Sequence, residues 1–421
     1  MFCGSLYNLI VPCRGSIKNK KKKIFNSGDF FYLNKKSIVR LEPHGAVIVP
    51  PGMMTNFIYL DNSFKKIFKE EKFNLSGFLE EDVKTLLKNK TILRKPSKKE
   101  IESRISKVEI DGLPVHALLD VTSACNCNCL TCYHKDDLNG FYPKIDDLKK
   151  RINKLKQLGI LLIEVTGGEP FLRDDLLEIL EYIKGQGLLF YVVTNGEFLC
   201  SADDSLIKSL RSGNGLAISL DGFGDKHDQM RRRPGLFKKI VKGLKVCSLN
   251  KIPVVLVSTL NKENVGSVSK MLKLARDNFC VLHLRPTIKT GAALSNNVQE
   301  SYPVDKVRAL LNDKNVRNGF LGEKRNVPVS CSYYGCGLRR RISVDVYGKI
   351  FPCVMDRSRN IGSVEKFNQL SIFKSLVKEV SYFLKQHNVC SVCDQFIKNK
   401  ENPICSGFCR FSNSYKNNLK K

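Results

Sequence analysis

Three cysteines in the first third of the chain have the types and spacing that point most directly to chemistry. Cys125, Cys129 and Cys132 follow the pattern CX3CX2C within one short run. Three thiolates at this spacing can hold three irons of a cubane iron–sulfur cluster, which leaves the fourth iron without a protein ligand. Four-cysteine ligation is typical of electron carriers, whereas an open iron can bind and reduce a substrate. The spacing therefore predicts a cluster that takes part in a reaction.

A zinc site is the alternative interpretation of this triplet, because structural zinc is held by four Cys or His ligands. His134 is the nearby residue that could supply the fourth ligand. Cys127 is an extra thiol inside the run, and we interpret it as a bystander that does not bind metal.

A second motif follows the cysteines at the end of an expected strand. Apolar side chains recur at helical spacing over residues 145–158, and Gly159 is typical of a helix end. Residues 160–165 then form an apolar run that leads into the sequence TGGEP at 166–170. Glycines at the end of a strand let a ligand approach the backbone closely, and a carboxylate there can bind an ammonium group.

The elements that must position these motifs are apolar strands alternating with helices or loops. Such strands imply a parallel sheet that helices cover from outside. Ligands bind at the carboxyl ends of the strands in folds of this class, and both motifs lie at such ends. The six predicted strands are residues 117–121, 160–165, 189–193, 216–220, 253–259 and 281–285.

The CX3CX2C run and the GGEP motif together resemble the radical SAM superfamily, whose members cleave S-adenosylmethionine (SAM) at a [4Fe-4S] cluster. The resemblance implies an α/β fold with a partial (β/α)6 barrel, and it assigns the cluster to the three cysteines of the run. It also implies that Gly167, Gly168 and Glu169 bind the amino group of SAM.

A third segment resembles the SLDG…HD…R pattern of one branch of that family. In that branch, the residues matching Ser219 and Arg231 contact the ribose and the carboxylate of SAM. An arginine suits this role because its planar fork can bind both oxygens of a carboxylate. A solvated basic run is the alternative for Arg231, and we expect His227 and Asp228 to fix a turn or a helix start.

A second group of cysteines begins after residue 330. Two of them flank a predicted β-hairpin with a Gly turn at Gly348, and CX2C and CX3C pairs follow. This arrangement resembles the SPASM domain, which holds auxiliary [4Fe-4S] clusters. A zinc ribbon is the alternative, because CX2C pairs are generic. The resemblance assigns one cluster to Cys331, Cys336, Cys353 and Cys409, and a second, whose presence and fourth ligand stay open, to Cys390, Cys393 and Cys405.

The length of 421 residues suggests two to three domains. We expect an N-terminal α+β region over 1–110, a radical SAM core over 111–325 and a small cysteine-rich SPASM domain over 326–421. In the first region, strands within 37–51, helices at 64–68 and 78–87, and a strand at 90–93 have the order of a winged-helix module; a family-specific addition to the barrel is the alternative. In peptide-modifying radical SAM enzymes, such a module grips a leader peptide as an added strand.

The net charge of +29 indicates a surface that attracts polyanions. The lysines are spread along the chain and are not interleaved with aromatic residues, so nucleic acid is not expected as a partner. There is no signal-peptide pattern and no apolar run long enough to span a membrane. Reduced thiols and labile clusters fit a reducing compartment, and we expect a cytoplasmic protein.

The function that the resemblance implies is SAM cleavage to a 5′-deoxyadenosyl radical, followed by hydrogen abstraction from a ribosomally made peptide to install a crosslink or another modification. A flavodoxin or ferredoxin would supply the electron. The motifs leave open a tetrapyrrole or other small-molecule substrate. From another class, an iron–sulfur redox or nucleic-acid-binding protein stays possible. The catalytic acid or base is not identified.

One subfamily is disfavoured. Enzymes that mature anaerobic sulfatases place an Asp directly after the second cysteine of the hairpin. Here Val354 occupies that position, and Asp356 is out of register.

Overall fold

The computed structural model divides the chain into two compact units, Phe2–Leu113 and Pro114–Lys421. The residues that the structure describes are 30–33, 37–42, 45–49, 58–61, 73–74, 86–87, 92–94, 104–110, 113–135, 138–287, 290–298, 316–318, 341–354 and 357–387.

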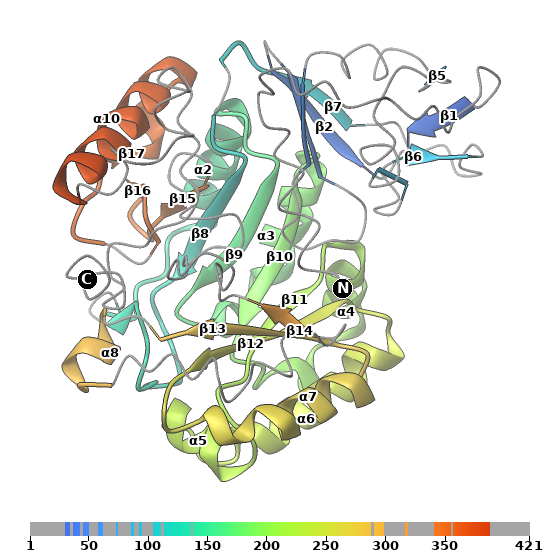
Figure 1. Ribbon diagram of the computed structural model, residues 1–421, viewed down its shortest axis with the longest axis vertical. Coiled ribbons are helices and arrows are strands. Elements are labelled where there is room, and N and C mark those ends of the chain that lie inside the picture. Colours follow the sequence, from blue (N-terminus) through green and yellow to red (C-terminus); the bar gives the residue numbers. More distant parts are fainter. Residues whose placement is uncertain are drawn as a thin grey trace, which may run out of the picture. The chain divides into compact units, whose positions relative to one another are not determined.

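The larger unit is built on a sheet of ten strands in the order β14-β13-β12-β11-β10-β9-β8-β15-β16-β17 (Figure 1). Neighbours from β14 to β15 are parallel, and the last two pairs are antiparallel. All six predicted strands are confirmed, as β8 to β13. The bounds are β8 His116–Thr122, β9 Leu162–Gly167, β10 Leu189–Thr194, β11 Leu216–Ser219, β12 Val254–Leu260, β13 Val281–Pro286, β14 Val316–Asn318, β15 Arg341–Val344, β16 Lys349–Phe351 and β17 Gly362–Ser363.

Helices connect the strands from β8 to β13, and α2, α3, α4, α6 and α7 each bury an apolar stripe. The predicted helix at 145–158 is confirmed as α2, which ends at Gln157, and Gly159 takes a left-handed conformation with φ +89°. Such a conformation strains residues that carry a side chain. The other helices are α3 Leu176–Gly185, α4 Asp204–Ser212, α5 Asp225–Arg231, α6 Leu236–Leu249, α7 Val268–Asp277, α8 Ala292–Ser295 and α10 Gln369–His387, with 3-10 turns η4 Pro170–Leu172, η5 Leu199–Ser201, η6 Val265–Ser267 and η8 Val364–Lys366.

The predicted hairpin of the C-terminal cysteine region is confirmed as β15 and β16, with Gly348 at φ +83° in the turn. It continues the barrel sheet, because β15 pairs in parallel with β8. Arg151 of α2 is buried and donates from Nη1 to the carbonyl of Val346 in the turn at 2.9 Å. Backbone pairing and this buried contact hold the hairpin against the barrel.

The smaller unit contains a four-stranded sheet, β4-β3-β2-β7, and a three-stranded sheet, β5-β1-β6. Strands predicted within 37–51 are confirmed as β2 and β3. Of the two predicted helices, 64–68 and nearly all of 78–87 lie outside the described residues, so the winged-helix assignment stays a prediction. The strands are β1 Phe30–Leu33, β2 Ile38–Glu42, β3 Gly45–Val49, β4 Ile58–Asp61, β5 Phe73–Asn74, β6 Ile92–Leu93 and β7 Arg104–Lys107.

The isolated cysteines of the barrel differ in burial. Cys247 and Cys280 are buried among apolar residues, as expected for thiols that act as small hydrophobes. Cys200 is exposed, because it lies in the 3-10 turn η5 and not on an inward-facing helix stripe. In the part of the chain that the structure describes, no helix is long and apolar enough to cross a membrane.

Candidate active site

The CX3CX2C run forms a loop at the carboxyl end of β8. Cys129 is buried, and Cys125 and Cys132 are half-buried. The loop is tied to the barrel by its backbone: the amide of Leu130 donates to the carbonyl of Met230 at the end of α5 at 2.9 Å. The loop is therefore held at both sides of the barrel mouth.

The cysteine loop and the strand end before it pack directly against the backbone of the glycines in the GGEP motif. A Cβ on Gly167 would lie 2.2 Å from the carbonyl oxygen of Thr122, and one on Gly168 would lie 2.0 Å from that of Ala124. The amides of Gly168 and Glu169 donate to those same two carbonyls at 2.8 Å. The end of β8 and the start of the cysteine loop therefore occupy the space beside these glycines. The role of Gly167 and Gly168 in binding SAM stays a prediction.

Glu169 is buried at the start of η4 and is surrounded by donors. Its carboxylate accepts from the hydroxyl of Thr194 at 2.7 Å, and from the amides of Asn195 at 2.7 Å and Phe171 at 3.1 Å. Burial nevertheless raises the pKa of Glu169 to about 7, although these hydrogen bonds oppose the shift. A buried carboxylate with a raised pKa is a group that a nearby cation would stabilise in its charged form.

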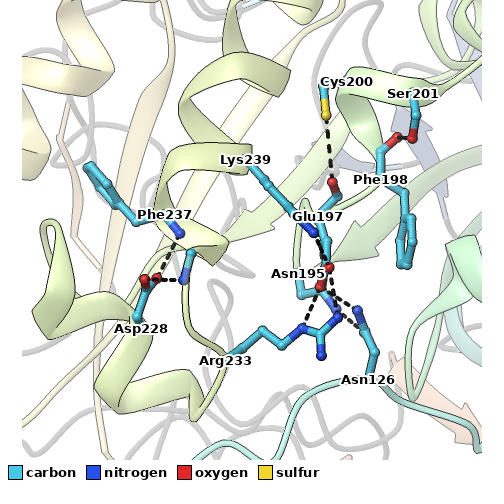
Figure 2. A network of polar contacts seen from close by, with 11 residues as sticks. Asn126, Asn195, Glu197, Phe198, Cys200, Ser201, Asp228, Arg233, Phe237 and Lys239 are labelled. Atoms are coloured by element: carbon cyan, nitrogen blue, oxygen red, sulfur yellow. Dashed lines mark hydrogen bonds and ion pairs between the residues drawn. The ribbon is translucent and has the colours of Figure 1, made fainter.

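A polar network extends from the cysteine loop to the loop after β10 (Figure 2). Asn126 accepts from the side-chain amide of Asn195 at 2.7 Å and donates to Glu197 at 2.5 Å. Glu197 is buried and also accepts from Arg233 at 2.9 and 2.8 Å and from Lys239 at 2.6 Å. Sequence reasoning missed this network; the Asn195-Gly196 pair after a strand was its visible signal.

The thiols of the loop influence one another. The Cys127 thiol lies within hydrogen-bonding reach of the sulfurs of Cys125 and Cys129, and this interaction lowers the pKa of both, for Cys129 to about 6. Burial raises the pKa of Cys132 to about 12. Among the residues described here, no three His, Cys, Asp or Glu side chains converge as they would around one metal ion. The cluster ligands therefore stay a prediction from spacing.

Arg231 lies beside the cysteine loop. Its guanidinium donates to the sulfur of Cys129 at 3.4 Å and pairs with the carboxylate of Asp221 at 2.8 Å. Burial alone would lower the pKa of Arg231, but the Asp221 carboxylate and the Cys129 sulfur raise it. Ser219 ends β11, two positions before Asp221. The basic side chain is thus a part of the barrel mouth and not of a solvated run.

Replacing Arg231 by alanine is expected to destabilise the chain by about 3–5 kcal/mol, because it leaves the buried Asp221 carboxylate without its cation. The Asp221 side chain is only 2% exposed. The matched control is Lys273→Ala, which removes an exposed partner of Asp277 and should change the stability by about 1 kcal/mol or less. Urea-induced unfolding followed by circular dichroism measures both. Equal losses of stability in the two variants would contradict a buried ion pair between Arg231 and Asp221.

His227 and Asp228 fix local structure, as the sequence indicated. Nδ1 of His227 accepts from the amide of Asp221 at 3.1 Å. The Asp228 carboxylate accepts from the amides of Gly235 at 2.6 Å and Phe237 at 2.7 Å, and it thereby caps the start of α6 (Figure 2).

A second polar cluster, absent from the sequence predictions, lies at the end of β8. Asp120 pairs with Arg357 at 2.8 Å and lies 3.7 Å from Nε2 of His134. Arg357 also contacts His134 at 3.2 Å and the hydroxyl of Ser343 at 3.1 Å. His134, considered above as a zinc ligand, is thus engaged with Asp120 and Arg357. No sequence motif linked Arg357 to the barrel, because the contact joins segments far apart in the chain.

The C-terminal cysteines can be followed only in part. Cys353 is described and half-buried, at the end of the hairpin, and Val354 follows it. Asp356 lies outside the described residues, as do the other predicted ligands, Cys331, Cys336, Cys390, Cys393, Cys405 and Cys409. Their role in auxiliary clusters stays a prediction.

Parts of this chain are similar in sequence to known proteins. The family model of the Radical SAM superfamily matches residues 119–275. The antilisterial bacteriocin subtilosin biosynthesis protein AlbA of Bacillus subtilis is 28% identical over 167 residues, 39% of this chain and 37% of AlbA. An AdoMet-dependent heme synthase of Methanosarcina barkeri is 28% identical over 197 residues, 45% of this chain and 55% of the synthase. The chain spans about half or less of the length of these curated relatives.

The fold extends the similarity to most of the chain. The crystal structure of Streptococcus suis SuiB bound to the precursor peptide SuiA has a TM-score of 0.64 and 14% identity, and covers 93% of this chain and 97% of SuiB. At this identity the likeness concerns the fold alone.

Proposed function

Residues 119–275 of this chain form a radical SAM domain, and from this premise we propose that the protein cleaves SAM reductively and uses the resulting radical to modify a ribosomally made peptide. The observation that carries the first part is the direct contact between the two motifs. The amides of Gly168 and Glu169 are bound to backbone carbonyls of Thr122 and Ala124, just before the first cysteine. This contact supports a single site for the predicted cluster ligands and the predicted SAM ligands.

The donor set fits a [4Fe-4S] cluster with an open iron. Cys125, Cys129 and Cys132 would hold it, since they lie on one loop that the barrel fixes at both sides. When bound, such a cluster supplies the electron that cleaves SAM to methionine and a 5′-deoxyadenosyl radical. Arg231 places a cation beside the Cys129 sulfur, which favours the thiolate form that a metal ligand needs.

Glu169 is suited to bind the ammonium group of SAM. Thr194 and Asn195 fix the orientation of its carboxylate, and burial keeps water away from it. Arg231 and Ser219 would contact the carboxylate and the ribose, as the family pattern implies. Arg231 at the end of α5 contacts the cysteine loop, and Ser219 lies at the carboxyl end of β11; both positions support this assignment.

SAM affinity is expected to fall as the pH is lowered through about 7. The pKa of Glu169 is raised to about 7, so the carboxylate is increasingly protonated below that pH and no longer attracts an ammonium group. The dissociation constant should rise with decreasing pH by up to about tenfold per unit. Calorimetric titration of the reconstituted protein with SAM measures this. Glu169→Gln should bind SAM weakly at every pH. If the dissociation constant of this variant depended on pH as steeply as that of the wild type, Glu169 would not be the group that binds the ammonium.

The peptide substrate rests on the relatives. AlbA acts in bacteriocin biosynthesis, and SuiB has been crystallised with a precursor peptide. A tetrapyrrole is the second candidate, because the heme synthase matches a similar share of this chain.

We also propose that the C-terminal region holds auxiliary [4Fe-4S] clusters, with Cys353 as one ligand. We propose that the protein is cytoplasmic.

The deciding experiment uses protein purified without oxygen and reconstituted with iron and sulfide. Addition of dithionite and SAM should yield 5′-deoxyadenosine. Short peptides encoded beside this gene and iron coproporphyrin are then supplied in parallel, and deuterium transfer from labelled substrate into 5′-deoxyadenosine identifies the one that is used. Transfer from the porphyrin alone would reject the peptide, and no 5′-deoxyadenosine from a protein with its full iron content would reject radical SAM chemistry.

A further inference from the structure

Helix α6 carries an unusual distribution of charge. Its fourteen residues include four lysines and no Asp or Glu. Each of the neighbouring barrel helices α2, α3, α4, α5 and α7 contains at least one acidic residue. The general excess of lysine in the chain therefore does not explain α6, which has no acidic residue to offset its own lysines.

The lysines lie on the side of α6 that faces solvent. The opposite side packs into the barrel through apolar residues such as Ile240 and Leu244, and a Cβ on Gly243 would lie 2.8 Å from Leu199 of η5. This close packing fixes the orientation of the helix. We call Arg232, Arg233, Lys238, Lys239, Lys242 and Lys245 the α6 basic face; all are exposed except Arg233, which is half-buried.

The first turn of this face is next to the cysteine loop. Arg233 and Lys239 both bind Glu197, which in turn binds Asn126 between Cys125 and Cys129 (Figure 2). Glu197 carries one negative charge against two cations, so the face keeps a positive surplus here.

Arg232 provides a second link to the same loop. It donates to Asn296 at 3.1 Å, and Asn296 donates to the carbonyl of Leu130 at 3.1 Å. Asn126 is half-buried and Asn128 is exposed, so part of the loop reaches solvent. Cations of the α6 basic face are thus linked by hydrogen bonds to the loop that carries the predicted cluster ligands.

The acidic residues at the edges of this face lie outside α6. Asp228 caps α6, Asp225 lies exposed at the start of α5, and Asp203 and Asp204 lie exposed at the start of α4, just after η5. A positive patch of this kind attracts a protein of opposite charge and raises its association rate at low salt.

We propose that the α6 basic face docks an acidic [2Fe-2S] ferredoxin that delivers the electron to the cluster. The reduced ferredoxin loses one electron and the cluster gains one, and no proton or bond is exchanged. A potential near −400 mV, typical of plant-type ferredoxins, makes this class a strong reductant. The proposal rests on the proposed function, because it requires the cluster at the CX3CX2C loop.

The test variant is the double charge reversal Lys238→Glu/Lys242→Glu, and the matched control is Lys374→Glu/Lys378→Glu. Both pairs are exposed and four residues apart, one on α6 and one on α10, and both change the net charge equally. With reconstituted holoenzyme, stopped-flow mixing with reduced plant-type ferredoxin gives the rate of cluster reduction. Calorimetry with the oxidised ferredoxin gives its affinity.

The α6 variant should lose about tenfold or more in both quantities at low salt, and the difference should vanish at high salt. The α10 control should keep most of the wild-type rate. Dithionite should reduce the cluster equally in all three proteins, as electron paramagnetic resonance detects. Equal losses in both variants, or none in either, would overturn the proposal. So would a variant that keeps ferredoxin binding but loses retention of a single-stranded oligonucleotide or of anionic lipid vesicles.

The readouts separate this proposal from the proposed function. Cluster reduction and ferredoxin affinity do not depend on SAM. If dithionite reduces the cluster but no 5′-deoxyadenosine forms, the proposed function fails and the docking result still stands. If the holoenzyme forms 5′-deoxyadenosine with dithionite but binds no ferredoxin, the docking proposal alone fails.

Discussion

Replacing Cys129 by alanine is expected to reduce 5′-deoxyadenosine formation to background. Cys129 is the buried member of the CX3CX2C triplet, and its sulfur accepts hydrogen bonds from Arg231 and Cys127. Low pKa is the property that makes a thiol a good metal ligand. Without this ligand a cubane at the loop has only two protein thiolates, so we expect it to be lost together with SAM cleavage.

The matched control is Cys127→Ala, one thiol removed from the same loop. We interpret Cys127 as a bystander that does not bind metal, although it lies between Cys125 and Cys129 and interacts with both by hydrogen bonding. Those hydrogen bonds raise the pKa of Cys127, the direction opposite to that of its two neighbours. This variant should keep its iron and its SAM cleavage.

Iron content, the ultraviolet–visible spectrum and 5′-deoxyadenosine are measured on both variants after anaerobic reconstitution. Loss of the site cluster in Cys127→Ala, with retention in Cys129→Ala, would show that the loop uses a different set of thiols. Iron retained in both at wild-type activity would contradict the assignment of the cluster to this loop. Any iron held by the C-terminal cysteines would raise the background equally in both variants, so the comparison between them is decisive.

Gly168→Ala is expected to cost about 1–3 kcal/mol of stability and to abolish SAM binding. The added Cβ would lie 2.0 Å from the carbonyl oxygen and 2.5 Å from the carbonyl carbon of Ala124. Backbone atoms cannot rotate away as a side chain can. The cysteine loop must therefore move, which also breaks the hydrogen bond from Glu169 to Ala124.

The control for this change is Gly185→Ala near the end of α3. A Cβ there meets nothing within 4 Å, and alanine favours a helix, so stability should rise by up to about 1 kcal/mol. Thermal unfolding and SAM titration are compared for the two variants. Normal SAM affinity in Gly168→Ala would show that the close approach of loop and motif is not required for the site.

Local patterns in the sequence were sufficient for the strands of the parallel sheet and for two motifs at their ends, whereas the resemblance to the radical SAM superfamily implied the barrel. Six continuous apolar runs between helices predicted six parallel strands, and all six are strands of one sheet. A parallel strand that is buried on both faces needs apolar residues at nearly every position, so a continuous apolar run indicates such a strand. Motifs at strand ends were also placed correctly at one edge, because parallel strands bring their carboxyl ends together.

The contacts made by these motifs were decided only by the tertiary structure. The GGEP motif could be recognised in the sequence. Its glycines are needed because Thr122 and Ala124 approach them closely, and this approach depends on two strands lying side by side. Arg231 could equally have been a solvated residue until its contact with Asp221 and Cys129 was known.

Side chains distant in sequence give the sharpest examples. Arg357 reaches Asp120 across more than half of the chain, and Glu197 joins Asn126 to Arg233 and Lys239. An ion pair has no periodicity and no fixed spacing, so no local pattern reveals it. The sequence by itself determined the strands, the cysteine triplet and the strand-end motifs, whereas only folding decided which charges meet, because that depends on the order of strands in the sheet.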